Sequence, residues 1–151
     1  MTSTVFKRPV SVLVVIHTPS LQVLLLRRVR PPDFWQSVTG SLEPGEAPQQ
    51  AALREIGEET GIAAGPEQLV DWHRSYEFVI RDEWRARYAP DVTHNTEHVF
   101  SLCVQGGQAI RLAPDEHDAL VWLPFEVAAT RVFSWTNREA ILELPRRERR
   151  S

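Results

Sequence analysis

Residues 40–62 are rich in glutamate and contain one arginine, Arg54. The glutamates are Glu43, Glu46, Glu55, Glu58 and Glu59. On an α-helix with about 3.6 residues per turn, Glu55, Glu58 and Glu59 lie on one face. Carboxylates this close repel one another unless a cation lies between them. Oxygen ligands suit Mg²⁺ or Mn²⁺ better than Zn²⁺, which prefers nitrogen and sulfur. The segment therefore predicts a site for a divalent cation.

The residues around these carboxylates predict a helix that would position them. Pro48 suits the first turn of a helix, where its missing N–H has no partner to lose. Gly61 suits the position that ends a helix with a positive φ. Leu53 and Ile56 lie roughly opposite the carboxylates, so we expect one face of the helix to contact the core and the other to face the metal.

The same segment resembles the motif of the Nudix hydrolase family, in which glycines, glutamates and one arginine recur at fixed spacing. The matching residues are Gly40, Glu46, Arg54, Glu55, Ile56, Glu58, Glu59, Gly61 and Ile62. A merely solvated acidic helix is the alternative, but such a helix does not require Gly40, Arg54 and Gly61 in register. The resemblance implies an α/β fold, namely a Nudix-type α/β/α sandwich around a mixed β-sheet.

The resemblance also implies a role for each of these residues. Glu55 and Glu59 would bind the metal, and Glu58 would be a ligand or would help to deprotonate water. Arg54 would orient a motif carboxylate, and Glu46 would support the geometry of loop and helix. Further metal ligands would be the Gly40 carbonyl and Glu116, the latter from a loop. The implied cofactor is Mg²⁺, with Mn²⁺ as a substitute, and the identity of the general base stays open.

Four other segments, residues 6–16, 32–40, 87–97 and 134–138, resemble the branch of the family that acts on dihydroneopterin triphosphate. That reaction yields the monophosphate and pyrophosphate in folate biosynthesis. Side-chain chemistry makes Lys7, Arg28, Thr39, Phe78 and Ser134 the candidate substrate-binding residues. Phe34, Trp35 and Trp135 are further aromatic candidates to cover a flat ring.

Two other functions remain open from the sequence. A nucleoside triphosphate diphosphohydrolase that removes damaged nucleotides would use the same motif, because specificity lies outside it. A non-catalytic Nudix module that senses a nucleotide is the second alternative. Such modules commonly lose a motif carboxylate, and this chain keeps all of them.

Composition limits the class of protein. The chain has 151 residues, 42% hydrophobic and 25% charged, which predicts one domain over residues 1–145 and a disordered tail over 146–151. The net charge of −3 argues against general binding of nucleic acid. The sequence lacks an apolar run of membrane-spanning length and a signal-peptide pattern, so we expect a cytoplasmic protein that does not bind membranes. The expected partner is a small-molecule triphosphate, and the expected state is a monomer or homodimer.

Hydrophobic patterning predicts the remaining elements. We expect strands over residues 10–16, 23–26, 69–78, 97–104 and 121–123, and helices near 125–130 and 137–144. Cys103 is expected to be a small buried hydrophobic residue. His94 and His117 show no ligand spacing and are interpreted as ordinary polar residues.

Overall fold

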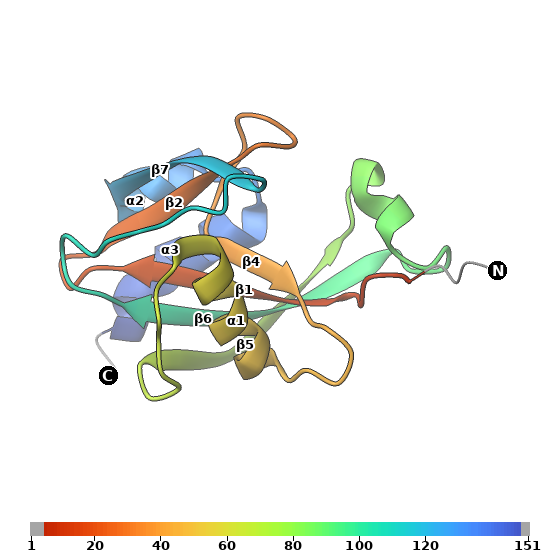
Figure 1. Ribbon diagram of the computed structural model, residues 1–151, viewed down its shortest axis with the longest axis horizontal. Helices are drawn as coiled ribbons and strands as arrows, with labels where there is room; N and C mark the ends of the chain where they lie inside the picture. The colour runs from red at the N-terminus through yellow and green to blue at the C-terminus, as the bar shows by residue number, and fades with distance from the viewer. Residues whose placement is uncertain (1–4, 149–151) are drawn as a thin grey trace.

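The computed structural model describes residues 5–148, and Figure 1 shows their arrangement. The strands are β1 (Val10–His17), β2 (Gln22–Arg28), β3 (Trp35–Gln36), β4 (Val38–Ser41), β5 (Leu69–Val79), β6 (His94–Cys103) and β7 (His117–Pro124). The helices are α1 (Pro48–Thr60), the 3₁₀ helix η1 (Asp82–Arg87), α2 (Phe125–Arg131) and α3 (Trp135–Glu148).

The strands form one mixed sheet. Its main order is β3-β2-β1-β6-β5, with β4 paired to β1 and β7 paired to β2. β1 and β6 run parallel, and the other pairs are antiparallel. The predicted α/β class with a mixed sheet is therefore confirmed.

Apolar side chains of β1 point alternately to the two faces of the sheet and belong to the cores on both sides. Val12, Val14 and Ile16 belong to the core cluster that contains Ala51, Ala52 and Ile56 of α1. Leu13 and Val15 belong to the cluster formed with α2 and α3. Successive side chains of a strand point to opposite faces, so α1 covers one face and α2 with α3 cover the other.

The sheet opens beside β1. β6 pairs with β1 along its whole length, so β2 and β4 must share the opposite edge of β1. β4 takes residues Ser11–Val14, while β2 meets β1 at His17. The two strands diverge from this point (Figure 1).

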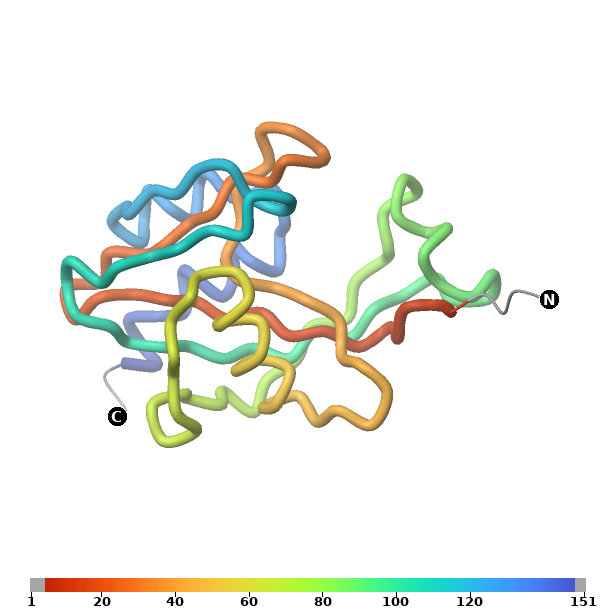
Figure 2. Tube along the Cα trace, viewed as in Figure 1, coloured from red at the N-terminus to blue at the C-terminus, as the bar shows by residue number. Residues whose placement is uncertain are grey.

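The segment between β5 and β6 projects from the body of the sheet. Figure 2 shows this segment, which contains η1, beside the N-terminal end of the described chain. The Lys7 amide donates a hydrogen bond of 2.8 Å to the Arg87 carbonyl, which ties the two segments together. This segment carries Arg81, Arg85 and Arg87.

The ends of α1 agree with the sequence prediction. Pro48 is its first residue, and Gly61 follows its last residue with φ of 76°. The Gly61 amide donates to the Gly57 carbonyl at 2.9 Å. The acidic motif therefore lies on the expected helix.

Two sequence predictions are wrong. The expected tail starts too early, because α3 continues to Glu148 and Arg147 donates hydrogen bonds to Glu143 at 2.7 Å and to the Trp72 carbonyl at 3.0 Å. The rest of the expected tail, residues 149–151, lies outside the described residues. Cys103, the last residue of β6, is exposed rather than buried. Between residues 5 and 148, no helix combines the length and apolarity that a membrane span needs.

Candidate active site

The carboxylates of α1 divide between two environments. Glu55 and Glu59 are buried, whereas Glu58 is exposed. The helix face expected to carry all three toward a metal therefore turns Glu55 and Glu59 inward and leaves Glu58 at its solvent edge. Both carboxylate oxygens of Glu59 are buried without a hydrogen-bond partner among residues 5–148.

Glu116 and His117 approach Glu59 from the start of β7. One ligand atom from each of the three side chains lies within 4.8 Å of the other two. Two carboxylates and an imidazole, with orphaned buried oxygens on Glu59, fit a divalent cation. These residues therefore form a possible metal-binding cluster, with Glu55 beside it.

Burial and mutual repulsion control the charge of these carboxylates. Burial raises the pKa of Glu59 well above its usual range, and the neighbouring Glu55 carboxyl raises it further. Burial also raises the pKa of Glu55, against the opposing effect of Arg54. A cation between the carboxylates would stabilise their ionised forms and reverse both shifts.

Arg54 donates hydrogen bonds to three carboxylates of the acidic motif. Its guanidinium donates two hydrogen bonds of 2.8 Å to Glu46 and one of 2.7 Å to Glu55. It also donates to Glu58 at 3.2 Å and to the Ser41 carbonyl at 3.1 Å. The Arg54 hydrogen bonds lower the pKa of Glu46 to about 2, so Glu46 stays ionised.

The Glu55 carboxylate lies against Gly40, where there is no side chain. A Cβ atom at position 40 would overlap the Glu55 carboxylate. Because Gly40 is on β4 and Glu55 is on α1, the missing side chain leaves room for the Glu55 carboxylate between strand and helix. The structure thus shows a steric reason for glycine at this position of the motif.

His117 is not an ordinary polar residue as the sequence analysis expected. It is buried, its Nε2 lies 3.2 Å from Gln36 Nε2, and the same atom lies 3.7 Å from Glu59 Oε1. Burial and then the charge of Arg28 lower its pKa to about 4, so the ring is neutral at pH 7. The spacing of the histidines gave no signal, because His117 meets Glu59 only through the fold.

Three cations face the acidic cluster. Lys7 precedes β1, Arg28 ends β2, and Arg87 ends η1. The pKa of Lys7 is lowered by burial and then by Arg87 and Arg28, and the pKa of Arg28 is lowered by burial and then by Arg87. Mutual repulsion among cations favours an anionic ligand between them.

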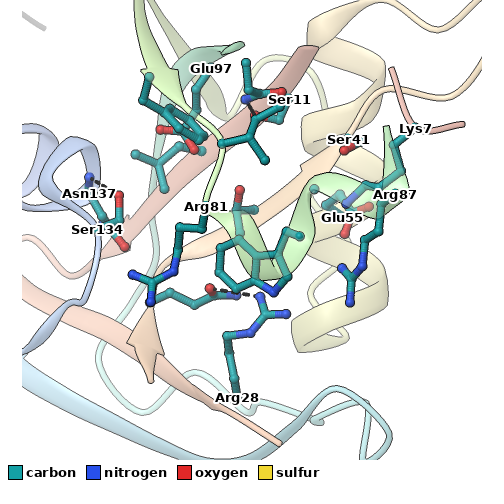
Figure 3. Close-up of a pocket in the computed structure, with 18 of the residues that line it drawn as sticks. Lys7, Ser11, Arg28, Ser41, Glu55, Arg81, Arg87, Glu97, Ser134 and Asn137 are labelled. Carbon is teal, nitrogen blue, oxygen red and sulfur yellow. Dashed lines mark hydrogen bonds between the residues drawn. The ribbon is translucent and has the colours of Figure 1, made fainter. Parts of the chain in front are cut away.

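These groups line one pocket of about 800 Å³. Figure 3 shows Glu55, Lys7 and Arg87 on one side of it, Glu97, Ser134 and Asn137 on the other, and Arg81 between them. A pocket of this size suits a nucleotide-sized molecule.

The predicted substrate-binding residues all line the pocket, namely Lys7, Arg28, Thr39, Phe78 and Ser134. The Thr39 hydroxyl already donates to the Val12 carbonyl at 2.9 Å. Trp135 lines the pocket as well. Phe34 instead stacks on Phe133 at 4.6 Å, and Trp35 lies under Arg27 at 5.7 Å.

Sequence reasoning missed other lining residues: Arg81, Trp84, Arg87, Asn95 and Glu97. Arg87, Asn95 and Glu97 belong to residues 87–97, one of the segments singled out by resemblance. The two-residue spacing of Asn95 and Glu97 on a strand was a usable signal, because it places both side chains on one face.

Comparison with known proteins agrees with this geometry. A family model described as the NUDIX domain matches residues 7–144. The dihydroneopterin triphosphate diphosphatase of Escherichia coli is 49% identical over 144 residues, covering 93% of this chain and 95% of that protein. The protein of the same name from Haemophilus influenzae is 41% identical over 139 residues, covering 90% and 87%. A solved structure of the E. coli dihydroneopterin triphosphate pyrophosphohydrolase matches with a TM-score of 0.84 and 49% identity, covering 91% of this chain and 94% of that one. The chain therefore belongs to the Nudix hydrolase family.

Proposed function

We propose that the protein hydrolyses dihydroneopterin triphosphate, with Mg²⁺, to dihydroneopterin monophosphate and pyrophosphate, a step of folate biosynthesis. The observation that carries the proposal is one pocket that joins buried carboxylates, three cations and aromatic side chains. The names of the relatives from E. coli and H. influenzae, whose similarity extends over most of this chain, support the choice of substrate.

The cations would bind the triphosphate. Arg28 and Arg87 offer planar sets of N–H donors to phosphate oxygens, and Lys7 adds a compact charge. Binding of an anion would also relieve the repulsion that lowers the pKa values of Lys7 and Arg28. Fixed positive charge at the phosphates offsets the negative charge that repels an attacking water.

The carboxylates would hold the cation. Glu59, Glu116 and Glu55 are the proposed ligands, with His117 and the Gly40 carbonyl as further candidates beside them. A bound divalent cation supplies Lewis-acid neutralisation of the diphosphate charge. Arg54 holds Glu55 in position, and Glu58 is proposed to act from the solvent edge as a further ligand or as the group that accepts a proton from water.

A panel of substrates tests the proposal. We would measure kcat/KM with Mg²⁺ for dihydroneopterin triphosphate, dATP, GTP and 8-oxo-dGTP, and identify the phosphate product. We expect dihydroneopterin triphosphate to be preferred by on the order of a hundredfold, because a purine on a closed ribose, in place of a pterin on an open hydroxylated chain, would leave two buried groups unpaired at about 1–3 kcal/mol each. The expected product is pyrophosphate.

The other outcomes identify the alternatives. A nucleoside triphosphate preferred by an order of magnitude would assign the protein to nucleotide sanitation instead. Tight nucleotide binding without hydrolysis of any substrate would support the sensing module. Release of orthophosphate would contradict the proposed position of cleavage.

A further inference from the structure

Two buried hydrogen-bond acceptors in the pocket take no part in the phosphate chemistry. Glu97 and Asn95 on β6 are 6% and 2% exposed, and both line the pocket. Among residues 5–148, neither Glu97 Oε1 nor Asn95 Oδ1 has a hydrogen-bond partner. Buried polar atoms are almost always paired, so these two oxygens indicate donors that a ligand would supply.

The surrounding contacts fix these two side chains. Asn95 donates through Nδ2 to Ser11 Oγ at 2.8 Å, which turns its carbonyl oxygen away from Ser11. The Thr136 hydroxyl contacts the Glu97 carboxyl and lies 2.8 Å from Ser134 Oγ. If Thr136 donates to Glu97, Ser134 must donate to Thr136. The contacts with Ser11 and Thr136 therefore orient the two acceptors.

Aromatic side chains flank the acceptors. In the register of β5 and β6, Phe78 lies opposite Asn95 and Tyr76 lies opposite Glu97. Trp135 packs against Tyr76 with ring centroids 5.7 Å apart and is 47% exposed. Phe78 and Trp135 both line the pocket, so a flat ring that reached Glu97 would have aromatic surfaces beside it.

The acceptors lie away from the phosphate-binding end. Figure 3 shows Glu97 on the side of Ser134 and Asn137, apart from Glu55, Lys7 and Arg87. A ligand with its phosphates at the cations would therefore extend its ring toward Glu97. This orientation places a carboxylate, the strongest acceptor available to a protein, at the edge of the ring.

We propose that Glu97, assisted by Asn95, recognises the ring edge that carries an N–H next to an exocyclic NH₂ group. The proposal deepens the function given above and rests on it for the identity of the natural substrate. The two Glu97 oxygens would accept from the ring N–H and from the amino group, and Asn95 would accept the remaining amino hydrogen. Glu97 is thus a specificity-determining residue for rings that carry an N–H next to an exocyclic NH₂ group.

Simple ring chemistry makes the proposal specific. Pterin and guanine both carry the N–H and NH₂ pair. Hypoxanthine keeps the N–H and lacks the NH₂ group. Adenine presents a ring nitrogen acceptor at the same place, which a carboxylate would repel. Comparison of guanine, hypoxanthine and adenine therefore distinguishes recognition of this ring edge from a general effect of the substitution on the pocket.

Binding of a ligand that lacks the triphosphate, measured without metal, reports on the part of the pocket that contacts the ring. We would titrate neopterin, which is fluorescent, and separately pyrophosphate, against the wild type, Glu97→Gln and the control Glu77→Gln. Glu77 is exposed on β5 opposite Thr96, so its side chain lies on the other face of the sheet from Glu97. We expect Glu97→Gln to weaken neopterin binding by about ten- to a hundredfold, the usual effect of losing a hydrogen bond to a charged group. Pyrophosphate binding should stay unchanged, and the control should behave as wild type.

Kinetics with GTP, ITP and ATP give the second measurement. Glu97→Gln should lower kcat/KM for GTP more than for ITP and should leave ATP unchanged or improved. Equal losses on all three, or unchanged neopterin binding, would overturn the proposal. A wild type that prefers GTP to dihydroneopterin triphosphate would refute the proposed natural substrate. In that case, a larger fall in kcat/KM for GTP than for ITP in Glu97→Gln would still support recognition of the ring edge by Glu97. Thermal melting of each variant establishes that it is folded.

Discussion

Arg54 binds Glu46 through two hydrogen bonds of 2.8 Å, from Nε to Oε2 and from a terminal nitrogen to Oε1. Glu46 precedes α1 and also accepts the Glu43 amide at 2.9 Å. The pair therefore fastens the loop before α1 to the middle of the helix. The same guanidinium holds Glu55, so the loop and the acidic cluster are connected through one side chain.

Replacement of Arg54 should damage both stability and activity. Arg54→Ala leaves Glu46 and Glu55 without their common donor, and we expect a loss of about 1–3 kcal/mol in unfolding free energy together with a fall in kcat. Arg54→Lys keeps the charge but cannot form the planar fork, so it should be intermediate. Urea unfolding and steady-state kinetics measure the two effects. Wild-type kcat in Arg54→Ala would contradict the role of Arg54 in orienting Glu55.

Neutralisation of Glu55 or Glu59 should separate activity from stability. We expect Glu59→Gln and Glu55→Gln to lose most activity because each removes a proposed metal ligand. With a chelator present, both variants should melt at or above the wild-type temperature, because the buried carboxylates repel each other and burial raises their pKa values. Glu77→Gln is the matched control. Near-normal turnover in either variant would remove that residue from the ligand set.

Glu116 should contribute less than the carboxylates of α1. It is an exposed loop residue, so Glu116→Gln should reduce activity moderately and should be partly rescued by higher Mg²⁺. Titration of activity with Mg²⁺ measures the shift in metal requirement. Asp118→Asn is the control, since the Asp118 carboxylate pairs with Arg27 at 2.8 Å. An unaltered Mg²⁺ requirement in Glu116→Gln would mean that Glu116 is a solvated loop residue.

The cations should affect binding of the triphosphate more than the chemical step that follows. We expect Lys7→Met and Arg87→Ala each to raise KM by roughly tenfold, the effect of losing a charge-assisted contact with phosphate. Arg85→Ala, an exposed position on η1 two residues before Arg87, provides the control. Measurements at two salt concentrations should show a weaker salt dependence in Lys7→Met and Arg87→Ala. A KM like that of the control would place the phosphates elsewhere.

Glu97 should make stability depend on pH. Burial raises its pKa from 4.5 to about 7, so the folded protein holds this proton more tightly than the unfolded chain does. Stability conferred by the protonated form is therefore present below pH 4.5 and is lost as the pH rises to about 7, by on the order of 3 kcal/mol. Tyr76, which lies opposite Glu97, has a pKa raised above 10 and does not titrate in this range.

Unfolding of the wild type and Glu97→Gln at about pH 5 and pH 8 measures this effect. The free energy of unfolding of the wild type should fall between these two pH values relative to that of Glu97→Gln. Glu77→Gln should show the same pH dependence as the wild type. Parallel profiles for the wild type and Glu97→Gln would show that Glu97 has an ordinary pKa in the folded protein.

Local sequence patterns were sufficient to identify the acidic helix, its ends and the family. Those features depend on local rules, because Pro48, Gly61 and the spacing of Glu55, Glu58 and Glu59 act within one helix. The alternation of apolar residues in β1 likewise predicted a buried strand. Lys7 and Arg28 were proposed from the sequence as cations that bind phosphate, and both line the pocket.

Which of these groups come into contact depends on the packing of segments that are distant in the sequence. Glu59 and His117 are 58 positions apart in the sequence, on α1 and β7, yet the fold brings their side chains within 3.7 Å. Burial, which depends on packing, made Glu59 and Glu58 chemically different although they are neighbours. The same is true of Glu97, whose unpaired oxygen and raised pKa arise because β1, β5 and α3 enclose it. Contacts of this kind depend on the closure of long loops and on packing, which local sequence patterns do not encode.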